Sequence, residues 1–369
     1  MAFLTMNTGK LKDNFDYLNT LFKNHHIQWT VVSKLLSGHK DYLTELLKLG
    51  ITQLSDSRIS NIKILKGIQP DIETIFIKPP AKRSLKNVIK YADISMNTEI
   101  RTIQLLSEEA KRQNKIHKIM IMIELGELRE GVMRDKFIDF FQKTFSLDNI
   151  EVAGIGTNLS CLYGVLPTKD KLIQLSLYKQ LIEAKFNVKI PYVSGGSSVT
   201  IPLLQQGLLP KGINHFRVGE SLFMGTDVYN DKPLEGLHTD VFQLYAEIIE
   251  LTKKPRVPSG QMGTNVEGEA YDFNEDDIGE TSYRAIIDLG LLDVEESHIM
   301  SVDKKIKIVG ASSDMIVLDL GENHQGYKVG DLVKFQLDYM GMLRVMNSRY
   351  IEKRVVSSAH RLLSYTQYL

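Results

Sequence analysis

A lysine follows an apolar, β-branched run near the start of the chain. Residues 27–32 have the sequence IQWTVV, and Lys34 comes two residues later. If this run is a strand of a parallel barrel, Lys34 lies at the barrel mouth, where partial desolvation lowers the pKa of an amine. A lysine of that kind can bond covalently to an aldehyde. The alternative is a lysine whose stem covers apolar surface while its charge stays in water.

A second polar segment, rich in glycine and serine, lies farther along the chain. Ser194–Ser198 (SGGSS) precedes the apolar residues Val199, Ile201 and Leu203, which predicts a loop followed by the start of a helix. Backbone amides and hydroxyls at such a position can bind phosphate, and Gly219 would add amides after the next strand. A plain helix cap is the alternative. A lysine and a phosphate site together fit pyridoxal 5′-phosphate (PLP), an aldehyde with a phosphate group.

The elements that must position these residues alternate between short apolar runs and longer amphipathic runs. Strand-like runs lie near residues 27–32, 51–54, 73–78, 93–96, 118–124, 151–157, 191–195 and 215–218. The clearest helical runs are Lys40–Leu49, Glu99–Gln113 and Lys169–Ala184. Eight strands, each of the first seven followed by a helical run, predict an α/β fold with a closed (β/α)8 barrel. A doubly wound open sheet is the competitor, but it usually has fewer strands.

The pattern changes after about residue 236, where β-rich runs are separated by Gly, Pro, Asn and Asp turns. These runs are Phe242–Leu251, Lys305–Val309, Met315–Leu320 and Asp331–Leu337. The sequence therefore predicts a barrel of residues 1–235, followed by a mostly β domain of residues 236–369.

Composition narrows the class of protein. The 369 residues include 45 Lys and Arg against 45 Asp and Glu, and this balance argues against a nucleic-acid-binding protein. A single cysteine, Cys161, excludes an internal disulfide and fits a reducing compartment. The nine scattered histidines predict no metal site. Because the start lacks an apolar leader and no apolar run is long enough to cross a membrane, we expect a cytoplasmic protein.

Seven stretches, in order and spread over both predicted domains, are specific in sequence. They are VVSKLLSGH (31–39), SDSRISNIK (55–63), ELGELREGV (124–132), GIGTNLSCLYGVLP (154–167), SGGSS (194–198), INHFRVGESLFMG (213–225) and LDYMGMLRVMNSRY (337–350). Together they resemble the alanine racemase-like PLP enzymes of fold type III, most closely the ornithine racemase branch.

The resemblance implies a role for each matching residue. Lys34 matches the lysine that bonds to PLP, and Arg217 matches the arginine at the pyridine nitrogen. Because arginine is effectively always protonated, it keeps that nitrogen unprotonated and so limits side reactions such as transamination. The other implied cofactor contacts are Arg129 near the phenolic oxygen, Asn158 beside the ring, Ser197, Ser198, Gly219 and Glu220 at the phosphate, and Tyr339, which closes the phosphate site from the β domain.

The resemblance also implies a composite site. Asp314 matches an acidic position that meets substrate from the partner subunit, which implies a head-to-tail homodimer whose β domain completes the neighbour's site. The loop of residues 261–271 (QMGTNVEGEAY) replaces the segment that supplies a tyrosine base in related enzymes, and Glu267 falls at the tyrosine by local spacing. Burial would raise its pKa and make it a base; the alternative is a solvated glutamate.

Three carboxylates are candidates for binding a distal ammonium group of the substrate: Asp56, Glu124 and Glu267. Asp56 and Arg58 together are the candidate substrate contacts after the second strand. The alternative is that Asp56 pairs with Arg58 and Glu124 pairs with Arg129.

The implied activity is amino-acid racemisation on ornithine or another basic amino acid. Lys34 would remove or return the Cα proton on one face, and a second group would do the opposite on the other. One alternative is a non-catalytic PLP-binding protein, although single-domain relatives of that kind lack a β domain. Another is a different PLP reaction on the same fold, such as aldol cleavage or decarboxylation.

Overall fold

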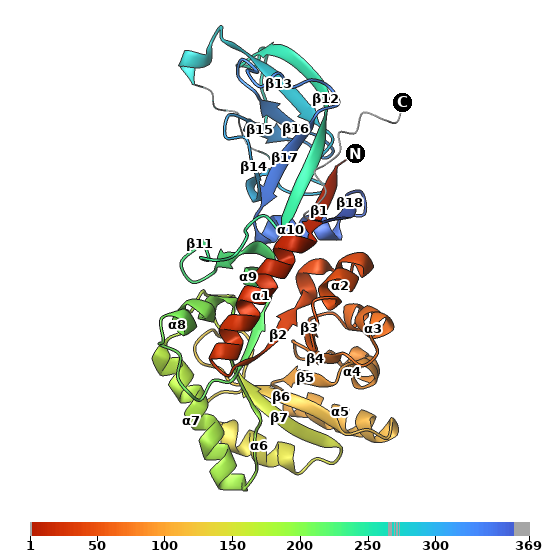
Figure 1. Cartoon of the computed structure of the whole chain (residues 1–369), viewed down its shortest axis with the longest axis vertical. Coiled ribbons are helices and arrows are strands. Elements are labelled where there is room, and N and C mark those ends of the chain that lie inside the picture. The colour runs from red at the N-terminus through yellow and green to blue at the C-terminus, as the bar shows by residue number, and fades with distance from the viewer. Residues whose placement is uncertain (1, 265–267, 269, 271, 273, 358–369) are drawn as a thin grey trace. The chain divides into compact units, whose positions relative to one another are not determined.

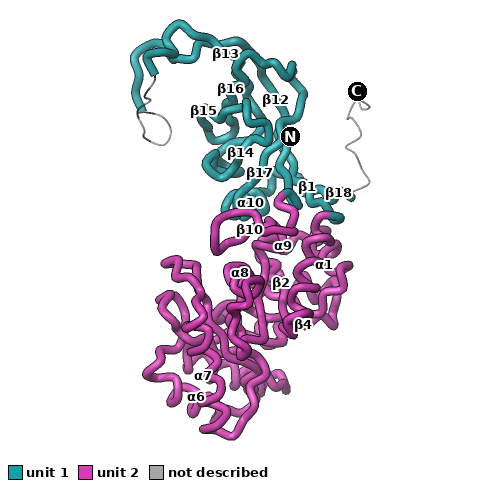
Figure 2. The backbone as a smooth tube through the Cα atoms, turned by 60° about the vertical axis from the view of Figure 1, so that its left-hand side comes forward, with its two compact units in different colours: residues 1–9, 240–369 teal, residues 10–239 magenta. Residues whose placement is uncertain are grey.

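The chain forms two compact units. The computed structural model describes residues 2–264, 268, 270, 272 and 274–357. One unit contains residues 10–239, and the other contains residues 1–9 and 240–369 (Figure 2). The expected division was 1–235 and 236–369, so the structure differs at both ends of the barrel. Strand β1 (Phe3–Asn7) joins the C-terminal unit because it pairs with strands more than 230 residues away, which no local sequence pattern indicates.

The larger unit is the predicted (β/α)8 barrel, which the structure confirms. Its eight strands are parallel and neighbour one another in chain order until the last closes onto the first (Figure 1). They are β2 (Gln28–Val32), β3 (Gln53–Asp56), β4 (Glu73–Phe76), β5 (Ile94–Asn97), β6 (His117–Met122), β7 (Ile150–Gly156), β8 (Tyr192–Ser197) and β9 (His215–Val218).

Helices cover the outside of this barrel (Figure 1). They are α1 (Thr8–Asn24), α2 (Lys40–Leu47), α3 (Ile59–Ile68), α4 (Leu85–Tyr91), α5 (Ile100–Arg112), α6 (Phe137–Phe145), α7 (Lys169–Phe186), α8 (Ile201–Gln205) and α9 (Glu220–Met224). Helix α5 shows why such segments are helical. The Glu99 side chain caps its N-terminus, and Leu106 and Ala110 pack with Val88 and Ile89 of α4. Each large apolar side chain buried in this way contributes roughly 1.5–3 kcal/mol.

The barrel strands carry several buried polar side chains. Thr30, Ser55 and Ser95 are fully buried. The Thr30 and Ser55 hydroxyls lie 2.8 Å apart, and Ser95 Oγ lies 2.8 Å from Nε2 of His117. Burial of a polar group is costly unless it is hydrogen-bonded, so these pairs stabilise a polar interior. Such an interior can connect side chains at the two ends of the barrel.

The smaller unit is built on an eight-stranded sheet. Its strands are β1, β12 (Phe242–Pro255), β13 (Thr281–Ile287), β14 (Ile299–Ser301), β15 (Lys307–Ala311), β16 (Ile316–Asp319), β17 (Leu332–Leu337) and β18 (Glu352–Val356). The four β-rich runs expected here correspond to β12, β15, β16 and β17. Helix α10 (Tyr339–Asn347) follows β17, and a short hairpin of β10 (Thr226–Asp227) and β11 (Lys232–Pro233) belongs to the barrel unit. A mostly β second unit is confirmed.

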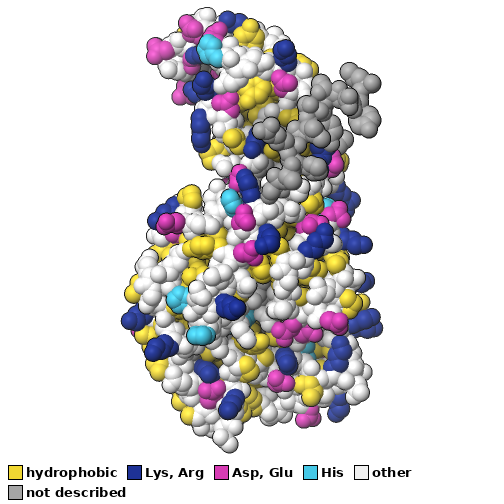
Figure 3. Space-filling model, viewed as in Figure 1, with side chains coloured by type: hydrophobic (Ala, Val, Ile, Leu, Met, Phe, Trp, Pro, Cys, Tyr) yellow, Lys and Arg dark blue, Asp and Glu magenta, His cyan; other side chains and the backbone are white. Residues whose placement is uncertain are grey.

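Acidic and basic side chains are interspersed on the face drawn in Figure 3, in keeping with a formal net charge of zero. Within the described ranges, none of the helices combines the length and the apolar character needed to span a membrane.

Candidate active site

Lys34 lies at the C-terminal end of the first barrel strand, as expected. Strand β2 ends at Val32, and the chain then turns through a 3₁₀ helix, Ser33–Leu36. Leu35 and Leu36 take the buried positions of this turn, and Lys34 is exposed. The two leucines after Lys34 anchor the turn in the apolar core. The expected partial desolvation of Lys34 stays a prediction.

Asp56 is a support for this turn. The Ser33 hydroxyl lies 3.0 Å from Oδ2 of Asp56, and Oδ1 accepts a hydrogen bond from the backbone N–H of Arg58 at 2.8 Å. Asn61 Nδ2 donates to both carboxylate oxygens. Burial raises the pKa of Asp56, and the hydrogen bonds oppose that shift. Because Asp56 is 0% exposed, this arrangement favours a positioning role over substrate contact.

The alternative charge pairs, Asp56 with Arg58 and Glu124 with Arg129, are not among the ion pairs of the described residues. Arg58 is exposed at the start of α3 and meets Asp56 through its backbone, not its guanidinium. Glu124 accepts a hydrogen bond from the backbone of Gly126, while Arg129 pairs with Glu130. Local turns occupy these two carboxylates instead. Asp56 and Glu124 each accept a hydrogen bond from the backbone amide two residues later in the chain.

Arg217 is buried on β9 and held by three hydrogen bonds. Nη1 donates to the carbonyl and hydroxyl of Ser194 at 2.8 and 2.6 Å, and Nη2 donates to the Thr157 carbonyl at 2.8 Å. Burial lowers the pKa of Arg217 to about 10, with Glu130 raising it and Arg129 lowering it further. Arg217 therefore remains a cation at neutral pH and has a fixed orientation.

The loops after β8 and β9 adjoin. The backbone N–H of Ser221 donates to Ser198 Oγ at 3.2 Å, and Ser197 caps the short helix that follows it. Gly219 lies against the end of β2, where an added Cβ would come 2.9 Å from the Val32 carbonyl oxygen. A glycine is therefore needed where the β9 loop approaches the turn that carries Lys34. Glu220 is the first residue of α9 and directly follows Gly219. The structure thus brings four of the expected phosphate contacts to these two loops: Ser197, Ser198, Gly219 and Glu220.

Arg129 is held beside the chain's single cysteine. Its guanidinium bonds to Glu130 and donates to Cys161 Sγ. The hydrogen bond and charge of Glu130 raise the pKa of Arg129. Since both Arg129 and Glu130 affect the pKa of Arg217, the two arginines lie within electrostatic range of each other.

One buried carboxylate fixes the loop after β7. The side chain of Glu127 is 1% exposed and accepts hydrogen bonds from the backbone of Ser160, Cys161, Tyr163 and Val165 at 2.8–3.1 Å. Burial alone would raise the pKa of Glu127, but these amides lower it below its usual value. Glu127 therefore sets the position of the loop that contacts Arg129.

Two side chains at the end of β7 have polar atoms without partners among the described residues. They are Asn158 Nδ2 and Thr157 Oγ1, both buried. Thr157 also provides the carbonyl that receives Arg217. Because buried polar atoms are nearly always hydrogen-bonded, this end of the barrel has the character of a polar ligand site.

The remaining expected site residues lie in the smaller unit. Tyr339 begins α10, whose N-terminus is capped by Asp338 through the Gly341 amide at 2.7 Å. Asp314 is exposed in the turn before β16 and accepts a hydrogen bond from the Ser313 hydroxyl at 2.7 Å. Glu267 falls outside the described residues.

A family model for the N-terminal domain of alanine racemase matches residues 6–227. The chain belongs to the alanine racemase family. The resemblance carried by the seven sequence stretches is thus confirmed, and so is the class of enzyme, an amino-acid racemase.

Two relatives match this chain over nearly its whole length. It is 35% identical over 354 residues to an ornithine racemase of Acetoanaerobium sticklandii, covering 96% of this chain and 99% of that protein. It is 31% identical over 350 residues to a lysine racemase of Thermotoga maritima, covering 95% and 97% of the two chains.

Solved structures show the same fold at low sequence identity. Alanine racemase from Bartonella henselae matches this family member with a TM-score of 0.73 at 16% identity, covering 96% and 99% of the two chains. A D-threonine aldolase from Filomicrobium marinum has a TM-score of 0.70 at 13% identity, covering 96% and 91%. Since both a racemase and an aldolase share the fold, the fold alone does not select the reaction.

Several residues around the site were not singled out from the sequence. These residues are Glu127, His215 and Gln53. Each supports the site through a hydrogen bond to a residue far away in the sequence: Glu127 bonds to Cys161, and His215 bonds to Gln53. One signal was present for His215: it lies two residues before Arg217 on a strand, so both side chains point to the same side.

Proposed function

We propose that the protein is a PLP-dependent racemase of basic amino acids such as ornithine or lysine. The observation that carries this proposal is that Lys34, in the turn after β2, and Arg217, on the adjacent strand β9, lie toward the same end of the barrel. In the register of β2 and β9, Thr30 is opposite Arg217, four residues before Lys34. The choice of a basic substrate rests on the two relatives that are at least 31% identical over nearly the whole chain.

The residues present fit PLP. The unpartnered atoms of Asn158 and Thr157 call for a polar ligand, and Gly219 lets the β9 loop come close to the turn that carries Lys34. Lys34 would hold the aldehyde carbon, Arg217 the pyridine nitrogen, and Arg129 the phenolic oxygen. Ser197, Ser198, Gly219, Glu220 and Tyr339 would hold the phosphate. When bound, PLP makes the Cα–H of an attached amino acid acidic.

Three side chains of the protein would act on the bound substrate and cofactor. Lys34 Nζ would take or return the Cα proton on one face of the substrate, and the buried Arg217 cation would donate a hydrogen bond to the pyridine nitrogen and disfavour its protonation. Glu267 is our candidate for the opposite face. Inversion needs a proton acceptor on each side of Cα, because one base alone returns the proton to the face from which it came.

The substrate's distal ammonium group needs an acidic partner. The Asp56 carboxylate already accepts hydrogen bonds from Ser33, Arg58 and Asn61, and Glu124 accepts one from the Gly126 amide, so both carboxylates are engaged within the barrel unit. Asp314 is exposed, and we propose that it meets the substrate in the partner's site of a head-to-tail homodimer. We further propose that the enzyme acts in the cytoplasm, where its single cysteine would remain reduced.

Hydrogen exchange at Cα tests the proposed function. The PLP-loaded protein is incubated with single enantiomers of ornithine, lysine and alanine in heavy water, and chirality and deuterium content are followed together. We expect deuterium to enter as the opposite enantiomer forms, with ornithine or lysine faster than alanine. Cleavage products, or neither exchange nor inversion, would instead support an aldolase, a decarboxylase or a PLP-binding protein.

A further inference from the structure

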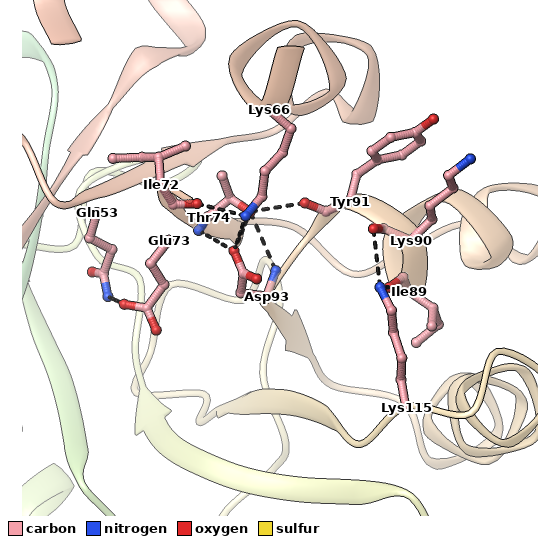
Figure 4. A network of polar contacts seen from close by, with 10 residues as sticks. All are labelled: Gln53, Lys66, Ile72, Glu73, Thr74, Ile89, Lys90, Tyr91, Asp93 and Lys115. Atoms are coloured by element: carbon pink, nitrogen blue, oxygen red, sulfur yellow. Dashed lines mark hydrogen bonds and ion pairs between the residues drawn. The ribbon is translucent and has the colours of Figure 1, made fainter. Parts of the chain in front are cut away.

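Five side chains form a continuous hydrogen-bonded string through the barrel. Arg217 Nη1 lies 2.6 Å from Ser194 Oγ, which lies 2.8 Å from Nδ1 of His215. His215 Nε2 lies 3.0 Å from Oε1 of Gln53. Figure 4 shows the last contact, in which Gln53 Nε2 lies 2.5 Å from Oε2 of Glu73. We call these five residues the arginine string.

The string crosses the inside of the barrel. His215 is on β9 and Gln53 is on β3, and both strands flank β2, so a contact between the two side chains spans the interior. Ser194 and His215 are 0% exposed, and Gln53 is 8% exposed. Water therefore competes little with the hydrogen bonds from Arg217 as far as Gln53.

The direction of every hydrogen bond in the string is determined by its two ends. Arginine can only donate, so Ser194 Oγ accepts from Arg217 and directs its own hydrogen to His215 Nδ1. At the other end, a carboxylate can only accept, so the Gln53 amide donates to Glu73 and turns its oxygen toward His215. His215 thus accepts at Nδ1 and donates at Nε2.

A neutral imidazole is required by this pattern. If His215 were protonated, Nδ1 would also donate toward Ser194 Oγ, and the serine hydrogen would lose its acceptor in a fully buried place. Burial and the charge of Arg217 lower the pKa of His215 to about 3, in agreement with a neutral ring. The ring of Tyr192 packs against it with centroids 5.0 Å apart.

We propose that the arginine string is a positioning device in which His215, fixed as the Nε2–H tautomer, holds Ser194 and Arg217 in one orientation and links that cation to Glu73. The part that concerns the cofactor rests on the proposed function, because it takes Arg217 to face PLP. Among the described residues, the contacts of Arg217 use three of its five N–H groups and leave Nε–H and one Nη2–H for a ligand. A fixed guanidinium presents those two donors without further ordering.

The far end of the string is accessible. Gln28, Gln53, Glu73 and Tyr192, the first residues of their strands, line a cavity of about 400 Å³. This cavity is therefore at the opposite end of the strands from Lys34. Glu73 is half-buried there, so it can be replaced without opening the core.

NMR of the full-length protein with ¹⁵N-labelled histidine tests the tautomer, with and without PLP. The His215 signals are those missing from His215→Asn. We expect an unprotonated Nδ1 and a protonated Nε2 from pH 6 to pH 9. A protonated Nδ1 or a cationic ring in this range would overturn the proposal, whether or not the protein racemises any amino acid.

Glu73→Gln tests the link to the far end. A glutamine can donate as well as accept, so the Gln53 amide loses its fixed orientation. We expect the His215 Nε2 resonance to shift in Glu73→Gln. Glu151→Gln, a change of an exposed glutamate on β7, is the control and should leave that resonance unchanged. An unshifted resonance in both variants would overturn the link.

Ser194→Ala tests the effect on the reaction. Arg217 keeps its bond to the Ser194 carbonyl but loses the hydroxyl, so we expect kcat to fall about tenfold while KM changes less than about twofold. The absorbance of bound PLP should also shift. The control is Ser95→Ala, which breaks a similar buried Ser–His pair, Ser95 with His117, outside the string. If both variants changed kcat and absorbance equally, the string would have no specific effect on Arg217, and the proposal would be overturned.

Discussion

The Ser33 hydroxyl lies 3.0 Å from Oδ2 of Asp56, and Ser33 immediately precedes Lys34. A buried carboxylate on the second barrel strand therefore fixes the turn that carries the lysine on the first. The same carboxylate accepts the Arg58 amide, so one residue organises the ends of two neighbouring strands.

Asp56→Ala should destabilise the protein. It leaves the buried Asn61 amide without its acceptor and the Ser33 hydroxyl with only the Ser55 carbonyl at 3.2 Å, and an unsatisfied buried group costs roughly 1–3 kcal/mol. We expect the free energy of unfolding to fall by about 2 kcal/mol or more, measured by urea denaturation. Asp71→Ala, at an exposed position, is the matched control and should change it by less than about 0.5 kcal/mol. Equal stability of the two variants would contradict the support role.

Glu127→Gln should loosen the loop after β7, with an effect that depends on pH. The folded-state pKa of Glu127 is lowered, so its carboxylate stabilises the fold above the usual pKa near 4.5, and this contribution is lost as pH falls through the lower folded value. We expect the melting temperatures of wild type and Glu127→Gln to differ at pH 7 and to approach each other as the pH falls below about 4.5. Hydrogen exchange at Cys161 and Tyr163 should be about tenfold faster in the variant at pH 7. A difference that grows toward low pH would give the wrong sign.

Lys34→Ala should abolish covalent attachment of PLP. The motivation is the position of Lys34 at the end of β2, beside the approach of Gly219. After borohydride reduction, mass spectrometry should find the cofactor on wild-type protein and on the control Lys40→Ala, and on Lys34→Ala at less than about a tenth of that level. A wild-type level of label on Lys34→Ala would remove Lys34 from this role.

The barrel was predictable from sequence because each of its strands is a local apolar run. The positions of Lys34 and Arg217 near strand ends were predictable because a charged residue follows or interrupts such a run there, whereas their roles toward PLP stay predictions. Strand β1 was not, since Phe3–Asn7 is stabilised by pairing with β12 and β18 and not by its own pattern. The exposure of Lys34 depends on which neighbouring side chains fill the core. Likewise, the role of Asp56 depends on Ser33, which lies 23 positions away.

Arg217→Glu should change the protonation state of bound PLP and the ratio of its reactions. A carboxylate in place of the cation favours a protonated pyridine nitrogen by direct attraction. We expect slower racemisation, relatively more transamination and a changed visible spectrum of bound PLP. In wild type, the spectrum should titrate near pH 10, because burial lowers the pKa of Arg217 to about 10. If Arg217→Glu kept the wild-type spectrum and the wild-type ratio of racemisation to transamination, Arg217 would not contact PLP.

Mixed dimers test whether the sites are composite. Lys34→Ala and Asp314→Ala, each an inactive homodimer if both residues are needed, are mixed under conditions that exchange subunits. If the Lys34 of one subunit works with the Asp314 of the other, each mixed dimer contains one intact site and one doubly defective site. Since half of the dimers are mixed and each has one good site of two, activity should rise to about a quarter of the wild-type value. The control is either variant exchanged with itself, which should stay inactive. Failure to recover activity, with exchange confirmed by mass spectrometry of isotope-labelled subunits, would mean that both residues act within one chain.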